Sequence, residues 1–498
     1  MENPHPPTSS AHPHVLVIPY PAQGHMISLL DLTYLLATRG LSLTVVVTPA
    51  NLPNLDSLLH RSTAEALSVQ PLVLPFPTSP TLPPGVENAQ HLAFPYYPHL
   101  IQALSALWEP IELWFRAHPS PPVAIISDFF AGWTQHLARS LGIRRIAFYS
   151  TRALVVSAFH SVWTHLPQRP ADRSSDDSFP IQLTDVPGSP TLSWIHLPQI
   201  YRRYQISEPV SEFLHDSFVA NESSWGSVIN SFRGLEAPYL DHLGRDGARV
   251  WAVGPMLPDA GQVSGRGGKS SVAPERVLEW LDSKPDRSVV YVCFGSQAVL
   301  SNLQMERLGS GLESSGVDFL WCVKGATTQA RPEEYGQDDI NVYAPVPAGL
   351  EERVQERGLI VRGWIPQLLI LKHRSIGAFL THCGWNSTLE GLASGVPLLA
   401  WPMGADQYLN ARLIADELGV GVRVCEGGQA VPDPAALAQA VVKLVRGPNK
   451  ERARAAEMKM RACQAVAEGG SSLADVEMLV KELRSLCSPG TADEQQGW

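Results

Sequence analysis

The N-terminal part of the chain alternates between apolar runs and a helical pattern. Residues 14–20 (HVLVIPY) form a short apolar run, and residues 21–25 (PAQGH) have the composition of a turn. In residues 26–39 the apolar positions recur at helical spacing, and Gly40 follows as a helix stop. Residues 41–48 (LSLTVVVT) are rich in β-branched side chains, which favour a strand. This order predicts a βαβ unit with parallel pairing and a right-handed crossover.

The same alternation continues along the chain. An apolar run at residues 123–130 (VAIISDFF) precedes a helical pattern at 131–142, and residues 144–150 (RRIAFYS) read as another strand. Residues 254–275 are rich in Gly, Pro and Ser, which is typical of an exposed linker. Beyond this linker the alternation of strands and helices restarts. Strands are expected at residues 288–296, 318–324, 358–364, 377–383 and 396–402.

These patterns predict an α/β protein with two doubly wound domains, each built on a parallel sheet. We expect Ser472 and Asp475 to open the last helix in a capping-box arrangement. The predicted organisation is a disordered tail at 1–13, a first domain at 14–253, the linker at 254–275, a second domain at 276–470, a C-terminal helix at 471–487 that packs back on the first domain, and a tail at 488–498.

Composition and charge narrow the function classes. Of the 498 residues 44% are hydrophobic and 17% are charged, and the net charge of −10 gives a nucleic-acid role no electrostatic support. No apolar run approaches the roughly 20 residues that a membrane helix needs, and the polar, proline-rich start lacks the pattern of a secretion signal. No two of the six cysteines have metal-ligand spacing, so we expect reduced thiols in a cytoplasmic protein.

The segment THCGWNSTLEG, from Thr381 to Gly391, places several polar side chains at a strand-to-helix corner. The unpaired N–H groups at a helix start favour a phosphate, and Gly384 lets the backbone approach closely. Asn386 and Ser387 add side-chain donors, and His382 can reach a phosphate oxygen. One turn later, Glu390 could accept from ribose hydroxyls. An ordinary capped helix is the alternative interpretation, because Asn and Ser are common caps.

The residues on both sides of this corner resemble the sequence signature of a known enzyme family. From Trp364 to Gln407 the chain closely resembles, without insertion, the signature box of the plant secondary-product glycosyltransferases, which use UDP-sugars. The stretches PYPAQGH, SDFFAGW and VCFGS are similar to the same family. The resemblance implies a GT-B fold, in which two Rossmann-like domains face a cleft. The UDP-sugar donor would bind the second domain and the acceptor the first.

The resemblance also implies roles for the residues of the donor site. Trp364 would stack on uracil, which suits the flat face of indole, and the backbone of Ile365 would pair with the base edge. Gln367 and Glu390 would hold the ribose. The diphosphate would be held by His382, Asn386, Ser387 and Ser296, close to Gly384, and the sugar would be faced by Trp385, Asp406, Gln407 and Ser150. Hydrogen-bond donors and dipoles then neutralise the leaving diphosphate, so no metal and no cofactor besides the co-substrate UDP-glucose is expected.

A candidate catalytic pair lies in the first domain. His25 follows the first strand and Asp128 ends the strand at 123–130, so both are placed at the carboxyl ends of strands, where doubly wound sheets bind ligands. A carboxylate bonded to one ring nitrogen fixes the tautomer of the histidine and stabilises the imidazolium. The family resemblance supports this dyad. Asp31 is the nearest competing carboxylate, but we expect it to lie solvated within the following helix.

The predicted reaction is a direct displacement with inversion. His25 removes a proton from an acceptor hydroxyl, the oxygen attacks the anomeric carbon of a UDP-α-sugar, and UDP leaves. Phenols suit this chemistry because their reference pKa is about 10. The stretches AFPYYPHL, AFHSVWTHL and LSWIHLP could equally line an apolar acceptor cleft or belong to the core. Arg152 stands where small or apolar residues are more usual in the family, which leaves the shape of the pocket open.

Asp406 and Gln407 favour UDP-glucose as the donor, because they can satisfy the hydroxyls of a neutral sugar. The expected enzyme is thus a UDP-glucose-dependent O-glucosyltransferase for flavonoids or simple phenolics. UDP-rhamnose, UDP-xylose and UDP-galactose stay open as donors. A UDP-sugar epimerase and a non-catalytic nucleotide-sugar sensor are the remaining alternatives, and an intact dyad and an apolar first domain argue against them. The sequence leaves open the natural acceptor, the modified hydroxyl and the oligomeric state.

Overall fold

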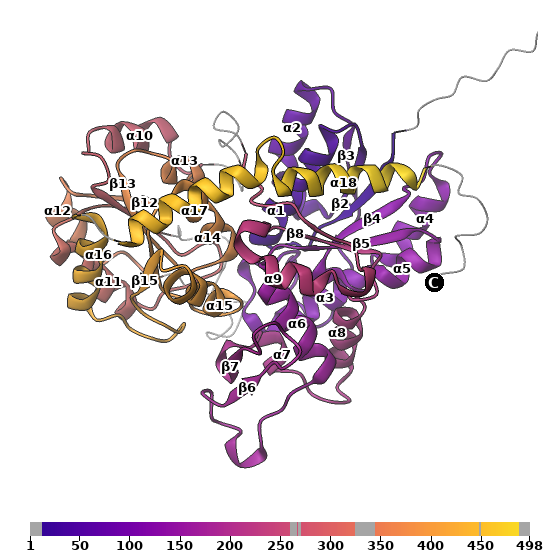
Figure 1. Cartoon of the computed structure of the whole chain (residues 1–498), viewed down its shortest axis with the longest axis horizontal. Helices are drawn as coiled ribbons and strands as arrows, with labels where there is room; N and C mark the ends of the chain where they lie inside the picture. Colours follow the sequence, from indigo (N-terminus) through magenta and orange to yellow (C-terminus); the bar gives the residue numbers. More distant parts are fainter. Residues whose placement is uncertain (1–11, 259–265, 267–269, 324–343, 448–449, 488–498) are drawn as a thin grey trace, which may run out of the picture.

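Two parallel β-sheets form the centres of two lobes that lie side by side in the computed structural model (Figure 1), which describes residues 12–258, 266, 270–323, 344–447 and 450–487. The strands of the first sheet, in spatial order, are β3 (Val69–Val73), β2 (Ser42–Val47), β1 (His14–Ile18), β4 (Ala124–Asp128), β5 (Arg144–Tyr149), β8 (Gly226–Ile229) and β9 (Val250–Ala252). Those of the second sheet are β12 (Gly358–Arg362), β11 (Asp318–Val323), β10 (Val289–Cys293), β13 (Ile376–Thr381), β14 (Leu398–Ala400) and β15 (Gly421–Arg423). The predicted pair of doubly wound parallel sheets is confirmed.

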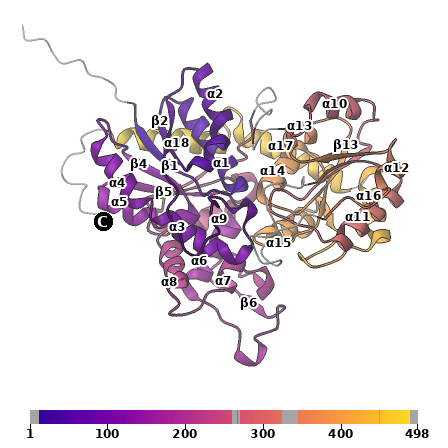
Figure 2. The ribbon, with the colours of Figure 1, turned by 180° about the vertical axis from the view of Figure 1, so that it is seen from behind.

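Helices cover both faces of each sheet (Figures 1 and 2). The first lobe contains α1 (Gln23–Ala37), α2 (Asp56–Ala64), α3 (Tyr97–Ser105), α4 (Trp108–Ala117), α5 (Thr134–Leu141), α6 (Ala153–His165), α7 (Gln199–Arg202), α8 (Pro209–Val219), α9 (Arg233–Leu243) and a small hairpin of β6 (Pro180–Gln182) and β7 (Thr191–Ser193). The second lobe contains α10 (Pro274–Asp282), α11 (Asn302–Ser315), α12 (Leu350–Val354), α13 (Gln367–Leu371), α14 (Trp385–Ser394), α15 (Gln407–Arg412), a π-helical turn (Leu413–Glu417), α16 (Pro434–Val445) and α17 (Lys450–Val466).

The alternation of side chains along the central strands explains these layers. In β1, Leu16 and Ile18 belong to the apolar core on one face of the sheet, whereas Val15 and Val17 belong to the core on the other face. Successive side chains of a strand point to opposite faces, so a strand that is apolar at every position needs cover on both sides. The fully buried run in β1 therefore requires helices on both faces, and β10 divides its side chains between two cores in the same way.

The strand order places a topological switch point in each lobe. The chain runs outward from β1 to β2 and β3 and then returns to β4 on the other side of β1. In the second lobe it runs from β10 to β11 and β12 and returns to β13 beside β10. Ligands of open α/β sheets bind outside the carboxyl ends of the strands at such points. Helices α1 and α14, which begin at the two switch points, contact each other between the lobes.

The last helix, α18 (Ser471–Ser485), leaves the second lobe and lies along the first (Figures 1 and 2). Its apolar residues join the core of the first sheet, and it contacts β9. The predicted capping box at its start is wrong, since the N-cap residue is Gly470 and no side chain caps the helix. Ser472 Oγ instead donates to the carbonyl of Gly254 (2.5 Å), and Asp475 accepts from the backbone N–H of Ala252 (2.8 Å). These polar residues attach the helix to the other lobe.

The predicted linker and the observed elements overlap at one end. Strand β9 ends at Ala252, but α10 already begins at Pro274, so the last two positions of the predicted linker at 254–275 are helical. Residues 259–265 and 267–269 of that linker lie outside the described residues. The same holds for residues 1–11 of the predicted N-terminal tail and for the C-terminal tail at 488–498.

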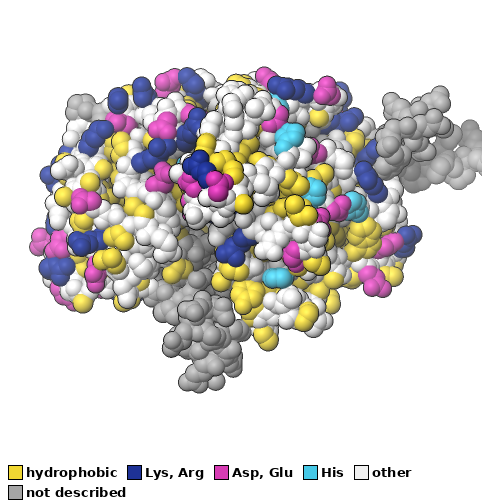
Figure 3. Space-filling view, turned by 90° about the horizontal axis from the view of Figure 1, so that it is seen from below, with side chains coloured by type: hydrophobic (Ala, Val, Ile, Leu, Met, Phe, Trp, Pro, Cys, Tyr) yellow, Lys and Arg dark blue, Asp and Glu magenta, His cyan; other side chains and the backbone are white. Residues whose placement is uncertain are grey.

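The surface mixes charges of both signs. On the face shown in Figure 3, Lys and Arg side chains are interspersed with Asp and Glu. This face shows no basic stripe of the kind that nucleic-acid binding uses, which agrees with the net charge of −10. In the part of the chain that the structure describes, none of the helices combines the length and the apolar composition needed to cross a bilayer.

Candidate active site

The predicted His25–Asp128 pair is formed at the switch point of the first sheet. His25 lies in the first turn of α1, directly after β1, and Asp128 is the last residue of the neighbouring β4. The distance from His25 Nδ1 to Asp128 Oδ2 is 2.8 Å. The carboxylate is fully buried, and its other oxygen accepts from the backbone N–H of Phe130 (2.9 Å). Asp128 is therefore held by two bonds and cannot rotate away from the imidazole.

This geometry assigns the two ring nitrogens of His25. Because Nδ1–H donates to Asp128, Nε2 is the nitrogen left to take up a proton from outside. Phe129 and Phe130 pack against the imidazole, with ring centroids 5.5 and 4.9 Å away. The side chain keeps 21% of its exposure and lines a cavity, whereas Asp128 lies behind it. His25 can thus accept a proton from a molecule bound in the cavity.

The cavity encloses about 630 Å³ between the two lobes. Residues from the carboxyl ends of β1, β5, β10 and β13 meet in its wall. All of the predicted donor-site residues line it, namely Ser150, Ser296, Trp364, Ile365, Gln367, His382, Gly384, Trp385, Asn386, Ser387, Glu390, Asp406 and Gln407. Positions spread over more than two hundred residues of sequence therefore share one site.

The start of α14 forms the centre of the cavity wall in the second lobe. Its N-cap is Gly384, and Cys383 before it adopts a left-handed backbone with φ of 65°. His382 is enclosed between two glycines: a Cβ at Gly295 would lie 2.6 Å from its ring, and one at Gly384 would lie 2.5 Å from it. Only glycine fits at these two positions, because the His382 ring occupies the space that a Cβ would need. The ring therefore lies against the start of α14, whose first N–H groups are unpaired. Such a corner can hold a phosphate.

Carboxylate and amide side chains gather beside this helix start. Gln367 Nε2 donates to Glu390 Oε2 (2.7 Å) and to Ser387 Oγ (3.0 Å). Glu390 Oε1 also forms an ion pair with Arg266, and Arg266 pairs in turn with Asp31 of α1 (2.8 Å). The expectation that Asp31 is solvated is thus wrong, since it lies in a largely buried ion triad with a side-chain exposure of 18%. Burial raises the pKa of Asp31, although the charge and hydrogen bond of Arg266 act in the opposite direction.

A second polar group lies where α15 begins. Asp406 Oδ2 accepts from Thr151 Oγ1 of the first lobe (2.7 Å) and from Asn410 Nδ2 (3.1 Å). Burial raises the pKa of Asp406, while these two hydrogen bonds lower it. Gln407 Oε1 accepts from the backbone N–H groups of Met403 (2.9 Å) and Gly404 (3.1 Å). The amide oxygen of Gln407 therefore fixes the preceding turn, which leaves its NH₂ group as the end that can turn to a ligand.

Two predicted donor-site residues also join the lobes. Asn386 Nδ2 donates to the carbonyl of Gly24 (2.7 Å), one residue before His25. Trp385, buried in the cavity wall, donates through Nε1 to the carbonyl of Asn230 (2.7 Å). These bonds set the distance between the helix start of α14 and the catalytic candidate of the first lobe.

Comparison with known proteins agrees with this geometry. A family model described as UDP-glucoronosyl and UDP-glucosyl transferase matches residues 249–454. The chain is 48% identical to UDP-glycosyltransferase 89B2 of Stevia rebaudiana, with 95% of this chain and 98% of that protein covered. It is 45% identical to the flavonol 3-O-glucosyltransferase UGT89B1 of Arabidopsis thaliana, with coverage of 95% and 96%. The chain belongs to the plant UDP-glycosyltransferase family.

Solved structures of this family have the same two-lobed fold. The crystal structure of Arabidopsis thaliana UGT89C1 complexed with UDP-L-rhamnose matches with a TM-score of 0.77 at 36% identity, covering 95% of this chain and 100% of that one. The complex of the same protein with quercetin matches with a TM-score of 0.75. The predicted GT-B fold is therefore confirmed, and the protein is a UDP-glycosyltransferase.

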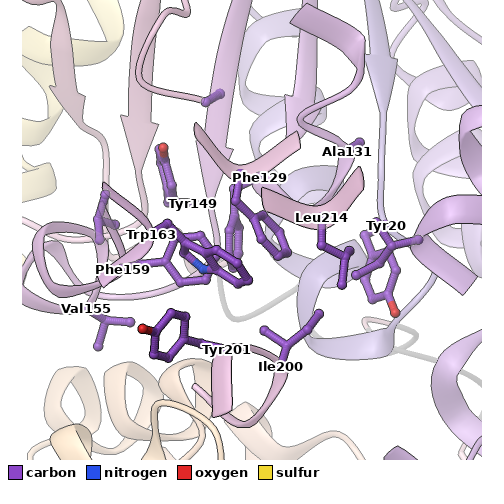
Figure 4. Packing of buried hydrophobic residues seen from close by; sticks show 14 of the residues in the cluster. Tyr20, Phe129, Ala131, Tyr149, Val155, Phe159, Trp163, Ile200, Tyr201 and Leu214 are labelled. Carbon is purple, nitrogen blue, oxygen red and sulfur yellow. The ribbon is translucent and has the colours of Figure 1, made fainter. Parts of the chain in front are cut away.

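The part of the cavity beyond His25 is apolar and aromatic. Figure 4 shows Phe129, Tyr149, Phe159 and Trp163 gathered in one group of side chains. Phe129 stacks on Tyr149 with centroids 5.3 Å apart and meets Phe159 edge-on at 5.6 Å. In this UDP-glycosyltransferase the three aromatic stretches contribute both to the cavity and to the core. Their cavity-lining members are Phe94, Tyr97, Ala158, Phe159, Val162, Leu192, His196, Leu197 and Pro198, whereas Leu100, Trp163 and Trp194 are buried in the core.

Arg152 does not line the pocket. Its neighbours Thr151 and Val155 line the cavity, but the guanidinium of Arg152 is buried between the lobes. It pairs with Glu236 (2.7 Å) and with Glu417 (3.1 Å). The unusual residue at this position therefore belongs to the lobe interface.

Among the cavity residues that sequence reasoning missed in this UDP-glycosyltransferase are Thr151 and Arg266. Thr151 follows Ser150 at the end of β5, and its place at a strand end is a signal that could have been used. Arg266 stands as a single basic residue in the glycine-rich stretch SGRGG, and no local pattern there indicates that it reaches Glu390.

Proposed function

We propose that the protein is an inverting UDP-glucose-dependent O-glucosyltransferase that acts on flavonoids or similar small phenolics. One observation carries the proposal: the Nε2 side of the His25–Asp128 pair opens to a cavity with two different ends. One end is aromatic, and the other contains a helix start of the kind that binds phosphate groups. The similarity to a flavonol 3-O-glucosyltransferase and to a protein crystallised with quercetin supports the acceptor class. Phenolic rings also suit the aromatic walls.

The mechanism follows from the positions of these residues. An acceptor hydroxyl beside His25 gives its proton to Nε2, and Asp128 stabilises the imidazolium that forms. The acceptor oxygen then forms a bond to the anomeric carbon while the bond to the UDP oxygen breaks. The helix start at Gly384 and the side chains of Ser387 and His382 bind the charge that develops on the diphosphate. Attack from the face opposite UDP inverts the configuration, so a UDP-α-sugar yields a β-glycoside.

UDP-rhamnose is the second candidate donor. UGT89C1, at 36% identity, was crystallised with UDP-L-rhamnose. Glucose is preferred here because Asp406 accepts hydrogen bonds and Gln407 can direct its NH₂ group to the sugar. A wrongly placed hydroxyl would leave one of these groups unpaired once the bound sugar covers it, at a cost of about 1–3 kcal/mol. We also place the enzyme in the cytoplasm, where its six unpaired cysteines would stay reduced.

The direct test of the proposal is product analysis. The purified enzyme is incubated with UDP-glucose and a flavonol such as quercetin, and the products are identified by mass spectrometry and by the anomeric coupling constant in proton NMR. A flavonol β-O-glucoside is the expected product. An isomerised nucleotide sugar, or binding of UDP-glucose without any product across a panel of phenolic acceptors, would contradict the assignment.

Donor preference is expected to favour glucose. In competition among UDP-glucose, UDP-galactose, UDP-xylose, UDP-rhamnose and UDP-glucuronate with one good acceptor, we expect kcat/KM to be highest for UDP-glucose, by about 5- to 150-fold over a sugar with one misplaced hydroxyl. No Arg or Lys stands in the segment AWPMGADQ to pair with the carboxylate of a glucuronate donor. A higher kcat/KM for any other donor would show that the roles of Asp406 and Gln407 are wrong.

Activity is expected to be independent of metal ions and of any further cofactor. The N–H groups at the start of α14, together with the side chains around it, supply the charge stabilisation that a metal would otherwise provide. Turnover after dialysis against excess EDTA should therefore equal turnover before it, and added Mg²⁺ or Mn²⁺ should not increase it. A loss of activity that either ion restores would mean that this helix start is not the main diphosphate site.

A further inference from the structure

The guanidinium of Arg152 makes bonds to both lobes. Nε donates to Glu236 Oε1 in α9 of the first lobe (2.7 Å). Nη2 donates to Glu417 Oε2 (3.1 Å) and Nη1 to the carbonyl of Leu409 (3.1 Å), both in the second lobe. The side chain is only 1% exposed. Breaking one partner of a buried ion pair is strongly unfavourable, because the other charge stays in a poorly solvated place. Arg152 therefore joins the lobes at a fixed distance.

Glu236 makes the first-lobe end of this connection rigid. Its side chain is fully buried and accepts from Ser231 Oγ (2.6 Å) and from the backbone N–H groups of Ala153 (2.8 Å) and Leu154 (3.2 Å). The two N–H groups belong to the first turn of α6, where a carboxylate is favoured by the unpaired donors. The carboxylate that binds the Arg152 guanidinium is therefore itself fixed to the start of α6. Arg152 consequently has little freedom to follow a shift of the second lobe.

The second-lobe end of the connection is α15, the helix that begins at Asp406 and Gln407 in the cavity wall. Helix α15 starts at Gln407, its N-cap is Asp406, and it carries the carbonyl of Leu409 that Arg152 binds. The preceding residue in the other lobe, Thr151, binds Asp406 directly (2.7 Å). Two consecutive residues of the first lobe therefore bind one short helix of the second. Thr151 binds α15 at its start, and Arg152 binds it about one turn later.

A change of helix type brings Glu417 to Arg152. After α15 the chain continues as a π-helical turn at Leu413–Glu417, in which the backbone N–H of Leu418 bonds to the carbonyl of Leu413. A π turn widens a helix locally and is found mostly at functional sites. Here it places Glu417 near the interface, where its other oxygen lies 3.6 Å from the half-exposed Arg412.

We propose that Arg152 is a positioning residue for glycosyl transfer: it locks α15 against the β5–α6 loop and thereby sets the place of Asp406 and Gln407 relative to His25. The sugar of the donor would lie between these groups, so a shift of α15 would move the anomeric carbon away from the attacking oxygen. The uridine and ribose candidates Trp364 and Glu390 lie on other elements and would not move with α15. This inference rests on the proposed assignment of Asp406 and Gln407 to the sugar.

The test separates the sugar part of donor binding from the nucleotide part. Dissociation constants for UDP and for UDP-sugars are measured by calorimetry without acceptor, and kcat and KM with acceptor, for Arg152→Lys and Glu417→Ala. Lysine keeps the charge but cannot reach three acceptors in two lobes. We expect the affinity of Arg152→Lys for UDP to stay within about 2-fold. Its UDP-sugar affinity should fall about 10-fold and kcat/KM about 100-fold, the loss typical of misplacement by about 1 Å.

Glu417→Ala removes the second-lobe partner at a half-buried position, where the fold tolerates truncation better, and we expect about a 10-fold loss in kcat/KM with unchanged UDP affinity. Arg412→Ala is the matched control, because it removes the other ion partner of Glu417 without touching Arg152, and it should behave as wild type. The concentration of active sites is determined by titration with UDP. A loss of folded protein therefore does not lower the kcat that is calculated per active site.

Equal losses of affinity for UDP and for UDP-sugars, or wild-type constants per UDP-binding site, would overturn the inference and leave Arg152 a purely structural residue. If the wild-type enzyme prefers a sugar other than glucose, the donor assignment fails separately. The ratio of UDP-sugar to UDP affinity, measured with that preferred sugar, then decides the role of Arg152.

Discussion

Replacing His25 by alanine is expected to remove nearly all transfer activity while leaving UDP binding within a few-fold of wild type. A general base contributes about 10²- to 10⁴-fold to a rate, and His25 is the cavity-lining side chain whose ring bonds to the Asp128 carboxylate. The nucleotide candidates lie on the second lobe, where the substitution changes nothing. The measurement is kcat with a saturating phenolic acceptor, together with the dissociation constant of UDP.

The first lobe offers a matched control for this experiment. His136 and Asp216 form a second His–Asp pair with a distance of 2.9 Å, but both side chains are exposed on the surface. His136→Ala should keep wild-type turnover. If His25→Ala retains a substantial rate with the same acceptor, a different group takes the proton and His25 is not the base.

Replacing Asp128 by asparagine is expected to lower kcat by about 10²-fold or more, with little change in donor affinity. Asparagine keeps the size of the side chain and can still accept from the N–H of Phe130. It lacks the negative charge that stabilises the imidazolium of His25 as the acceptor proton arrives. The experiment compares kcat and the UDP-glucose dissociation constant of the variant with those of wild type.

The surface pair again supplies the comparison, since Asp216→Asn makes the same chemical change beside a histidine outside the cavity. That variant should be indistinguishable from wild type. An unaltered rate in Asp128→Asn would show that the carboxylate only positions the ring, and the dyad mechanism would have to be abandoned.

Long apolar runs made most of the fold predictable from the sequence. Strands such as β1, β4, β10 and β13 are buried along their whole length or nearly so, and a buried parallel strand reads as a continuous apolar run. The strands that sequence reasoning missed lie toward the sheet edges or are short. They are β3, β6, β7, β8, β9 and β15. In β3 most side chains are partly or fully exposed, so the apolar pattern that identifies a strand is weak there.

The candidate site was predictable where its residues follow strand ends or belong to a continuous motif. His25, Asp128 and the segment from Trp364 to Gln407 are of this kind. His25 and the predicted donor-site residues of this segment line one cavity, and Asp128 lies behind His25. Polar residues whose partners lie far away in the sequence were interpreted wrongly, or their role was left open. Asp31 was expected to face solvent, and Ser472 and Asp475 were expected to cap their own helix, whereas the effect of Arg152 on the pocket was left open.

The two α/β lobes, a helix start that could hold a phosphate and the two candidate catalytic residues were predictable from the sequence, because they depend on local periodicity and on residue types at the ends of strands. The partners of the buried charges became known only from the three-dimensional structure. A carboxylate such as Glu236 or Glu390 can be satisfied by any donor that the fold brings near, and the donor here comes from far along the chain or from the other lobe. Burial makes such pairing obligatory, but local sequence does not identify the partner, since the distance between the lobes is set by packing.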